Sequence, residues 1–184
     1  MIFRAPYSGS MEWSSVFRNI SRAALLDVDF YNRAEVDTSL NVQAVAVVVI
    51  ASGLAGFGSA VATGSNLLAA AGLSAVTGVL GWLLWSFVAM IVGTKIFGGT
   101  SDFGQMCRVI GFAYAPLGIG VIPWLGFPGA VWVLVAAVIA IREGMDFSTK
   151  RSIATMIVGW GAWLLATVVL NLLLDWEMRS AWPF

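Results

Sequence analysis

Long uncharged stretches dominate the pattern of this chain. No charged side chain occurs in three blocks, which cover residues 38–94, 109–141 and 152–174. A helix that crosses the hydrocarbon core of a bilayer needs about 20 mostly apolar residues. The first block is therefore long enough for two membrane-spanning helices, the second for two short ones and the third for one.

Breaks within these blocks set the boundaries of five predicted spans. Small and polar residues at positions 63–66 end the first span, and the apolar turn at residues 123–129 holds two prolines and two glycines, which interrupt helices. Pro116 should kink the third span. One long broken segment over residues 105–141 is the alternative to two helices there. The predicted spans cover residues 40–62, 71–97, 105–122, 126–142 and 152–174.

The first 37 residues carry a different pattern. Trp13, Phe17 and Ile20 recur at helical spacing, and Arg18 and Arg22 lie off that stripe. Such a pattern suits a helix that lies in the membrane interface, and a short cytosolic helix packed on the loops fits it equally well. We expect an all-α fold, in which an N-terminal segment with an amphipathic interfacial helix (1–37) precedes a five-transmembrane-helix bundle (38–175) and a short external tail (176–184).

Composition supports a membrane protein and excludes several other classes. Hydrophobic residues make up 59% of the 184 residues and charged residues 11%, against about 25% charged in a typical soluble domain. The chain has no histidine, one cysteine (Cys107) and no net charge. It therefore has no intrachain disulfide, lacks the commonest metal ligand and general base, and shows no basic patch for nucleic acid.

The basic residues predict an orientation. Under the five-span model, all ten Lys and Arg residues except Arg179 fall on one side of the membrane. Cytoplasmic loops are enriched in these residues. We therefore expect a multi-pass protein of the cell (inner or plasma) membrane, with the N-terminus cytoplasmic and the C-terminus external.

Polar residues near the spans are the candidates for contacts with a partner or a lipid. They are Arg108, Tyr114, Pro116, Arg142, Lys150 and Arg151. Arg108 reads either as a topology anchor or as a buried arginine that pairs between helices and holds a partner or lipid headgroup. Tyr114 and Pro116 suggest a kink that either serves packing or shapes a cavity. The charged loop that contains Arg142, Lys150 and Arg151 either binds anionic headgroups or is an ordinary cytoplasmic loop.

Tryptophan positions give a further expectation. Trp124, Trp132, Trp176 and Trp182 fall near the predicted external ends and suit an aromatic belt. Trp82 and Trp85 fall within the second span, where we expect them to face lipid or a partner.

Several stretches together resemble the Yip-one family of five-span membrane proteins, in its prokaryotic branch. They include residues 24–31, 93–100 and 141–152, and the most specific is the stretch from Arg108 to Pro116, which reads Arg-x-x-Gly-x-Ala-x-Ala-Pro. The resemblance covers residues 25–174. It implies a cytosolic N-terminus and an external C-terminus. Eukaryotic members bind Rab GTPases, but their N-terminal Asp-Leu-Tyr-Gly-Pro stretch is absent here, so that function is not carried over.

The sequence contains no nucleophile–base pair, no paired intramembrane carboxylates and no phosphate-binding loop. We expect no enzyme activity, no cofactor and no catalytic or metal site. The leading hypothesis is a non-catalytic scaffold or partner-binding protein in the bilayer, with other membrane proteins as partners. The alternative is an accessory subunit of a larger membrane complex, for example an energy-transducing one. A transporter or channel of small solutes or ions is less favoured, because few polar groups occur at mid-membrane depth.

Overall fold

The computed structural model describes residues 13–181, apart from the side chains of residues 13, 171 and 173–181. Within this part of the chain every regular element is helical, which confirms the all-α class. In chain order the elements are α1 (Trp13–Ala24), α2 (Val28–Val36), the 3-10 turn η1 (Thr38–Leu40), α3 (Asn41–Thr63), α4 (Leu67–Ile91), the π-helical turn η2 (Val92–Ile96), α5 (Phe103–Ala113), the 3-10 helix η3 (Ala115–Val121), α6 (Gly126–Gly144) and α7 (Thr149–Ala181).

Four of the described helices are long and apolar enough to cross a membrane. They are α3, α4 together with η2, α6 and α7, and their bounds lie close to four of the predicted spans. The stretch predicted as a third span instead divides at Tyr114 into α5 and η3. Pro116 explains the division, because it cannot donate the next backbone hydrogen bond of an α-helix and it lies in the first turn of η3.

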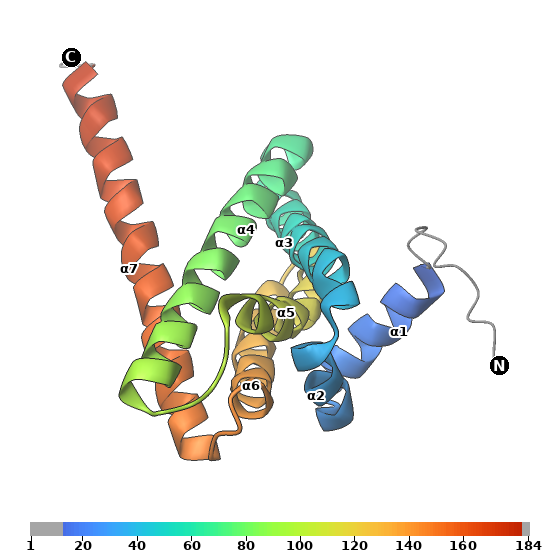
Figure 1. Cartoon of the computed structure of the whole chain (residues 1–184). Helices are drawn as coiled ribbons and strands as arrows, with labels where there is room; N and C mark the ends of the chain where they lie inside the picture. The colour runs from blue at the N-terminus through green and yellow to red at the C-terminus, as the bar shows by residue number, and fades with distance from the viewer. Residues whose placement is uncertain (1–12, 182–184) are drawn as a thin grey trace.

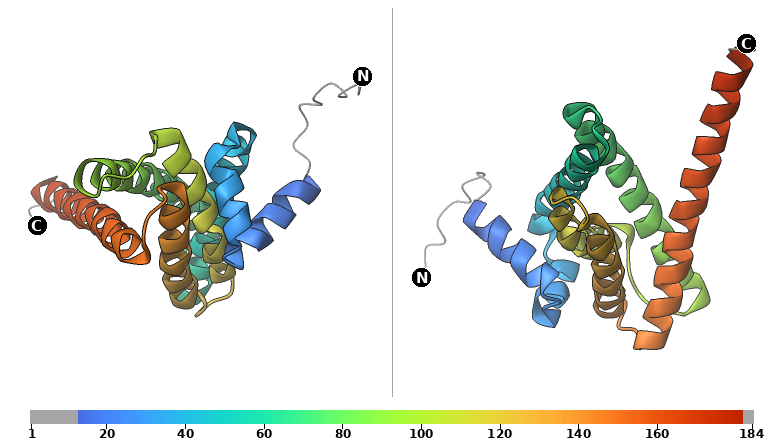
Figure 2. Two further views of the ribbon diagram at one scale, coloured as in Figure 1. Left: turned by 60° about the horizontal axis from the view of Figure 1, so that its bottom comes forward. Right: turned by 180° about the vertical axis from the view of Figure 1, so that it is seen from behind.

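The short helix α5 forms the centre of the molecule. All residues from Arg108 to Tyr114 are buried, and α5 contacts α2, α3, α4 and α6 (Figures 1 and 2). The rings of Phe112 on α5 and Phe30 on α2 meet edge to face, with 4.8 Å between their centroids. The most specific part of the family resemblance is thus the buried hub around which the longer helices pack.

The N-terminal helices pack onto this hub. Phe30 and Tyr31 of α2 are fully buried. α1 turns Val16, Asn19 and Ala23 inward, whereas Phe17 is 66% exposed. The stripe expected on this helix therefore faces outward at Phe17 and is half-buried at Ile20; the side chain of Trp13 lies outside the described residues.

Close backbone approaches hold α3 against its neighbours. A Cβ added at Gly56 would lie 2.3 Å from the Ser74 hydroxyl on α4, and one at Gly58 would lie 1.9 Å from the Gly120 carbonyl oxygen on η3. These glycines therefore serve packing inside the molecule, in the way that small residues serve membrane helices generally. Gly64, with φ of 71°, ends α3 and lets the chain turn into α4.

α7 packs on the other helices only along its first half. Trp85 of α4 lies against Gly159, and Trp163 lies against Gly81. Beyond Trp163 the described side chains are exposed except for Thr167, and Figure 1 shows α7 diverging from α4 toward the C-terminus. The helix runs on to Ala181, through residues expected to belong to an external tail.

The structure corrects the expectation for two tryptophans. Trp82 and Trp85 are 5% and 2% exposed, so they do not face lipid. The indole N–H of Trp82 donates a hydrogen bond to the Cys107 carbonyl of α5 at 2.9 Å. The Trp82 ring thus lies against α5, and the Trp85 ring packs against Gly159 of α7. Trp124, by contrast, is 89% exposed. The side chains of Trp176 and Trp182 lie outside the described residues.

Candidate functional site

Arg108 joins three helices at one junction. It is 5% exposed, and its Nε donates to the Ala34 carbonyl of α2 at 2.9 Å. One terminal nitrogen donates to the Glu35 carbonyl, and the other donates to the Asn41 side-chain oxygen, at the start of α3, at 3.0 Å. The guanidinium group therefore has fixed partners in this fold, as expected for a buried arginine that pairs between helices.

The position of Arg108 follows from the chemistry of helix ends. The last carbonyls of a helix have no intrahelical partner and carry a partial negative charge. Arg108 satisfies two of these carbonyls on α2. At the end of α1, the Tyr31 hydroxyl donates to the Ala23 carbonyl at 3.2 Å and the Trp132 indole N–H donates to the Ala24 carbonyl at 2.8 Å. Side chains from elsewhere in the fold thus attach the ends of both N-terminal helices to the bundle.

A polar chain links the N-terminal helices to α3. Arg33 donates to the Asn19 side-chain oxygen at 2.9 Å, and the Asn19 amide donates to the Gln43 side-chain oxygen at 2.8 Å. The guanidinium carbon atoms of Arg22 and Arg33 lie 5.7 and 5.5 Å from the centroid of the Phe30 ring. These contacts fix α1 and α2 relative to the first membrane-spanning helix.

An acidic group lies beside the Arg108 junction. Partial burial, reinforced by the Asp146 carboxylate, raises the pKa of Glu35, while the Arg108 guanidinium opposes the shift and Glu143 adds to it. Glu143 also pairs with its neighbour Arg142, with Nε and Oε1 2.6 Å apart. The end of α6 and the loop that follows it therefore bring the carboxylates of Glu143 and Asp146 toward the end of α2.

The other charged candidates lie at the end of α6 and at the start of α7, on either side of this loop. Lys150 and Arg151 are exposed in the first turn of α7, and Arg142 is half-buried at the end of α6. Arg142, Glu143 and Asp146 line an open groove together with three uncharged neighbours. The structure does not bring these residues into contact with Arg108 itself.

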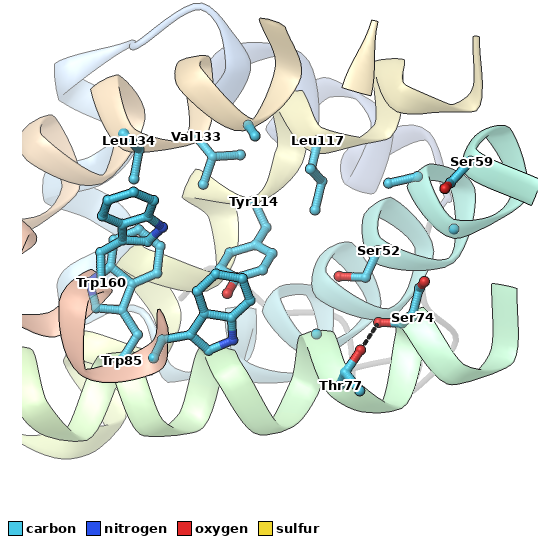
Figure 3. A pocket seen from close by; sticks show the side chains of 15 residues that line it. Ser52, Ser59, Ser74, Thr77, Trp85, Tyr114, Leu117, Val133, Leu134 and Trp160 are labelled. Carbon is cyan, nitrogen blue, oxygen red and sulfur yellow. Dashed lines mark hydrogen bonds between the residues drawn. The ribbon is translucent and has the colours of Figure 1, made fainter. Parts of the chain in front are cut away.

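Tyr114 and Pro116 lie at the break between α5 and η3, and both are buried. Tyr114 lines a half-open pocket of about 380 Å³, whose other lining residues lie on α3, α4, η3, α6 and α7. Figure 3 shows Tyr114 and Ser52 among the side chains that border this space, and the Ser52 hydroxyl lies against Gly78 of α4. The kink of the chain at Pro116 thus serves packing and also borders a cavity.

Sequence reasoning missed most of the residues around these sites. Ser52 gave no signal, since a single serine in an apolar helix is ordinary. Trp160 and Trp163 line the cavity, and their i, i+3 spacing on the last span would have indicated a shared aromatic face. The partners of Arg108 could not have been found, because they are backbone carbonyls and an amide about 70 positions away along the chain.

The helices and their burial define a multi-pass α-helical integral membrane protein. A family model for the Yip1 domain matches residues 27–173. The chain belongs to this family, as its Arg108–Pro116 stretch indicated, and the matched region begins just before α2 and includes the greater part of α7. Comparison with curated proteins and with solved structures finds no match.

Proposed function

We propose that this chain is a non-catalytic membrane scaffold that binds another membrane protein along the outer half of α7. The observation that carries the proposal is the exposure of that half. Leu165 and Leu172 are each 65% exposed, and Val168 is 53% exposed. No described element packs over them, so lipid or a second protein covers this surface in the membrane.

The length of α7 favours a protein partner over lipid alone. Its 33 residues extend about 50 Å at 1.5 Å per residue, whereas the hydrocarbon core is about 30 Å thick. The uncharged stretch of this helix ends at Leu174, and the charged residues Asp175, Glu177 and Arg179 follow it. The helix therefore continues beyond the bilayer as a projecting segment, which a bilayer alone does not stabilise.

The junction around Arg108 supplies the rigidity that a scaffold needs. It fixes α2 on the bundle, while Asn19, Tyr31 and Trp132 make the hydrogen bonds that attach α1. Phe17 and Arg18 remain exposed on the outer side of α1. This arrangement supports a role for α1 at the membrane interface, through the stripe of Trp13, Phe17 and Ile20. The basic residues Arg142, Lys150 and Arg151 would then lie next to anionic headgroups.

Purification in a mild detergent tests the scaffold proposal. We expect the chain to elute with at least one other membrane protein, and the triple variant Leu165→Ser, Val168→Ser and Leu172→Ser to lose it. Leu68→Ser, Leu73→Ser and Leu80→Ser on the exposed face of α4 form the matched control and should retain the partner. A wild-type chain that elutes alone would contradict the proposal.

A second candidate function is that of an accessory subunit of a larger membrane complex, for example an energy-transducing one, which the projecting α7 also favours. Stoichiometry distinguishes the two functions. A dedicated subunit co-migrates with one complex at a fixed ratio and leaves no free pool, whereas a scaffold leaves part of the chain unbound.

We also propose a five-span topology in the plasma membrane, with a cytoplasmic N-terminus and an external C-terminus. If α5 and η3 follow one another across the bilayer, their 11 and 7 residues extend about 30 Å together, enough for one crossing. The concentration of Lys and Arg on one side supports the same direction. Alkaline phosphatase fused after Ala181 tests this orientation, because the enzyme is active only on the external side of the membrane. We expect an active fusion, and an inactive one would contradict the proposed topology.

A further inference from the structure

Three arginines gather on the outer surface of the N-terminal helices. Arg18 and Arg22 lie one turn apart on α1, and Arg33 lies on α2. The guanidinium groups of Arg22 and Arg33 both lie over the ring of Phe30, which is fully buried. Because like charges repel one another, such a concentration of guanidinium groups favours a negatively charged partner.

The described residues supply only part of that negative charge. Arg22 pairs with Asp27, with Nε and Oδ2 2.6 Å apart, and Asp29 adds a second carboxylate near Arg22. Arg33 donates one of its five N–H groups to an uncharged amide oxygen and forms no salt bridge with a described residue. Arg18 is exposed and likewise pairs with no described carboxylate. Arg18 and Arg33 are therefore available to a further anion.

The arginines lie near the end of a membrane-spanning helix. Asn19, which accepts the hydrogen bond from Arg33, donates in turn to Gln43, the third residue of α3. α3 is one of the helices suited to cross the membrane, and its 23 residues extend about 35 Å, close to the thickness of the hydrocarbon core. Its first turn therefore lies at the depth of the lipid headgroups.

α1 separates an apolar side from a basic side. One line of residues on this helix faces the bundle. Phe17 and Ile20 lie on one side of that line, and Arg18 and Arg22 lie on the other, which is the side that meets α2. An interfacial helix turns its apolar residues toward the acyl chains and its basic residues toward anionic headgroups. The surface of α1 therefore matches a phospholipid in both charge and polarity.

We propose that Arg18, Arg22 and Arg33 bind the phosphate of an anionic phospholipid in the leaflet where α3 begins. Guanidinium groups form strong, often bidentate hydrogen bonds with phosphate, and the exposed Phe17 ring contacts the acyl chains. The proposal rests on the interfacial position of α1 proposed above. It is independent of the protein partner proposed for α7, because α1 and α7 lie on opposite sides of the molecule (Figures 1 and 2).

Native mass spectrometry of the purified full chain tests this assignment with two lipids that have the same acyl chains. They are dioleoylphosphatidylglycerol, which is anionic, and dioleoylphosphatidylcholine, which is zwitterionic. We expect the anionic lipid to bind about 10-fold more tightly, since each arginine beside an anionic group contributes about fivefold and Asp29 offsets part of the total. Arg18→Gln should reduce this preference to about twofold, and the double variant Arg18→Gln and Arg33→Gln should abolish it.

Lys95→Gln is the matched control, because it removes one exposed positive charge on η2, outside the arginine cluster. This variant should keep the full preference for the anionic lipid. Equal affinity of the wild type for both lipids would overturn the proposal. A loss in Lys95→Gln as large as that in Arg18→Gln would overturn it as well, because it would show a general attraction of positive charge.

Two further outcomes keep the test decisive. Displacement of the anionic lipid by millimolar inorganic phosphate would show a site for a soluble anion and would overturn the assignment to a lipid. The double variant loses the hydrogen bond from Arg33 to Asn19, so its folding is checked by its melting temperature. Arg18→Gln alone removes no hydrogen bond to a described residue, and an unchanged lipid preference in that variant would contradict the proposal.

Discussion

At the scale of single residues, Arg108 illustrates what the sequence could and could not reveal. An arginine beside an apolar stretch indicated an anchor or a buried pair, and the structure shows it buried with three acceptors. No carboxylate among the described residues pairs with it directly. Its acceptors are two carbonyls at the end of α2 and one amide, which carry no signal in the sequence because any residue supplies a carbonyl.

Replacement of Arg108 tests the importance of the junction. Arg108→Gln should lower the free energy of unfolding by about 2–4 kcal/mol, since hydrogen bonds to a charged group contribute about 1.5–3 kcal/mol each and glutamine can replace only part of them. Thermal unfolding in detergent measures the loss. Arg18→Gln, an exposed position on α1, is the control. Equal melting temperatures for the two variants would contradict the account of the junction.

Glu35 predicts a pH dependence that belongs to the same junction. Its pKa is raised by partial burial and by Asp146, so the folded state holds this proton more tightly than the unfolded state. The contribution of Glu35 to the free energy of unfolding is fully present below the ordinary Glu pKa of about 4.3. It is lost as the pH rises toward the raised pKa of the folded state. Glu35→Gln should therefore raise the melting temperature at neutral pH and flatten its fall above pH 4. An unchanged slope would contradict this prediction.

At the scale of elements, four spans were predictable because their length and composition match the bilayer. The bounds of α3 and α6 differ from the prediction by at most two residues. The region around α5 was harder to interpret, because an apolar helix buried by its neighbours and one that faces lipid have the same composition. Only Pro116 indicated a break. The prediction that Trp82 and Trp85 face lipid or a partner was wrong for the same reason, since the sequence does not show which face of α4 is buried.

The contact between α3 and η3 gives an element-scale prediction. Gly58→Ala should lower the free energy of unfolding by about 3 kcal/mol, the upper end of the range for an overpacked core. The reason is that the new methyl group collides with the backbone of Gly120, which cannot move aside as a flexible side chain can. Gly72→Ala is the matched control on α4, where nothing lies within 4 Å. This control should preserve or slightly increase stability, because alanine favours helix. Comparable losses in both variants would contradict the packing described for α3.

At the scale of the whole molecule, two surfaces remain for interactions. The outer half of α7 diverges from the bundle, and the exposed side of α1 holds Phe17 and Arg18 (Figures 1 and 2). The divergence of α7 was not predictable, because hydropathy locates a span without showing how closely it packs. Membership of the Yip1 domain family agrees with the resemblance of residues 108–116, and the structure adds that this stretch is a buried hub.

Site-specific cross-linking in native membranes tests the central claim that a protein partner binds α7. A photoreactive amino acid at Leu165 should give one discrete protein adduct, because that side chain faces away from the bundle. The same group at Leu80 on α4, which is 60% exposed, should give lipid adducts alone. Lipid adducts alone from both positions would show that the bilayer covers α7 and would contradict the scaffold function.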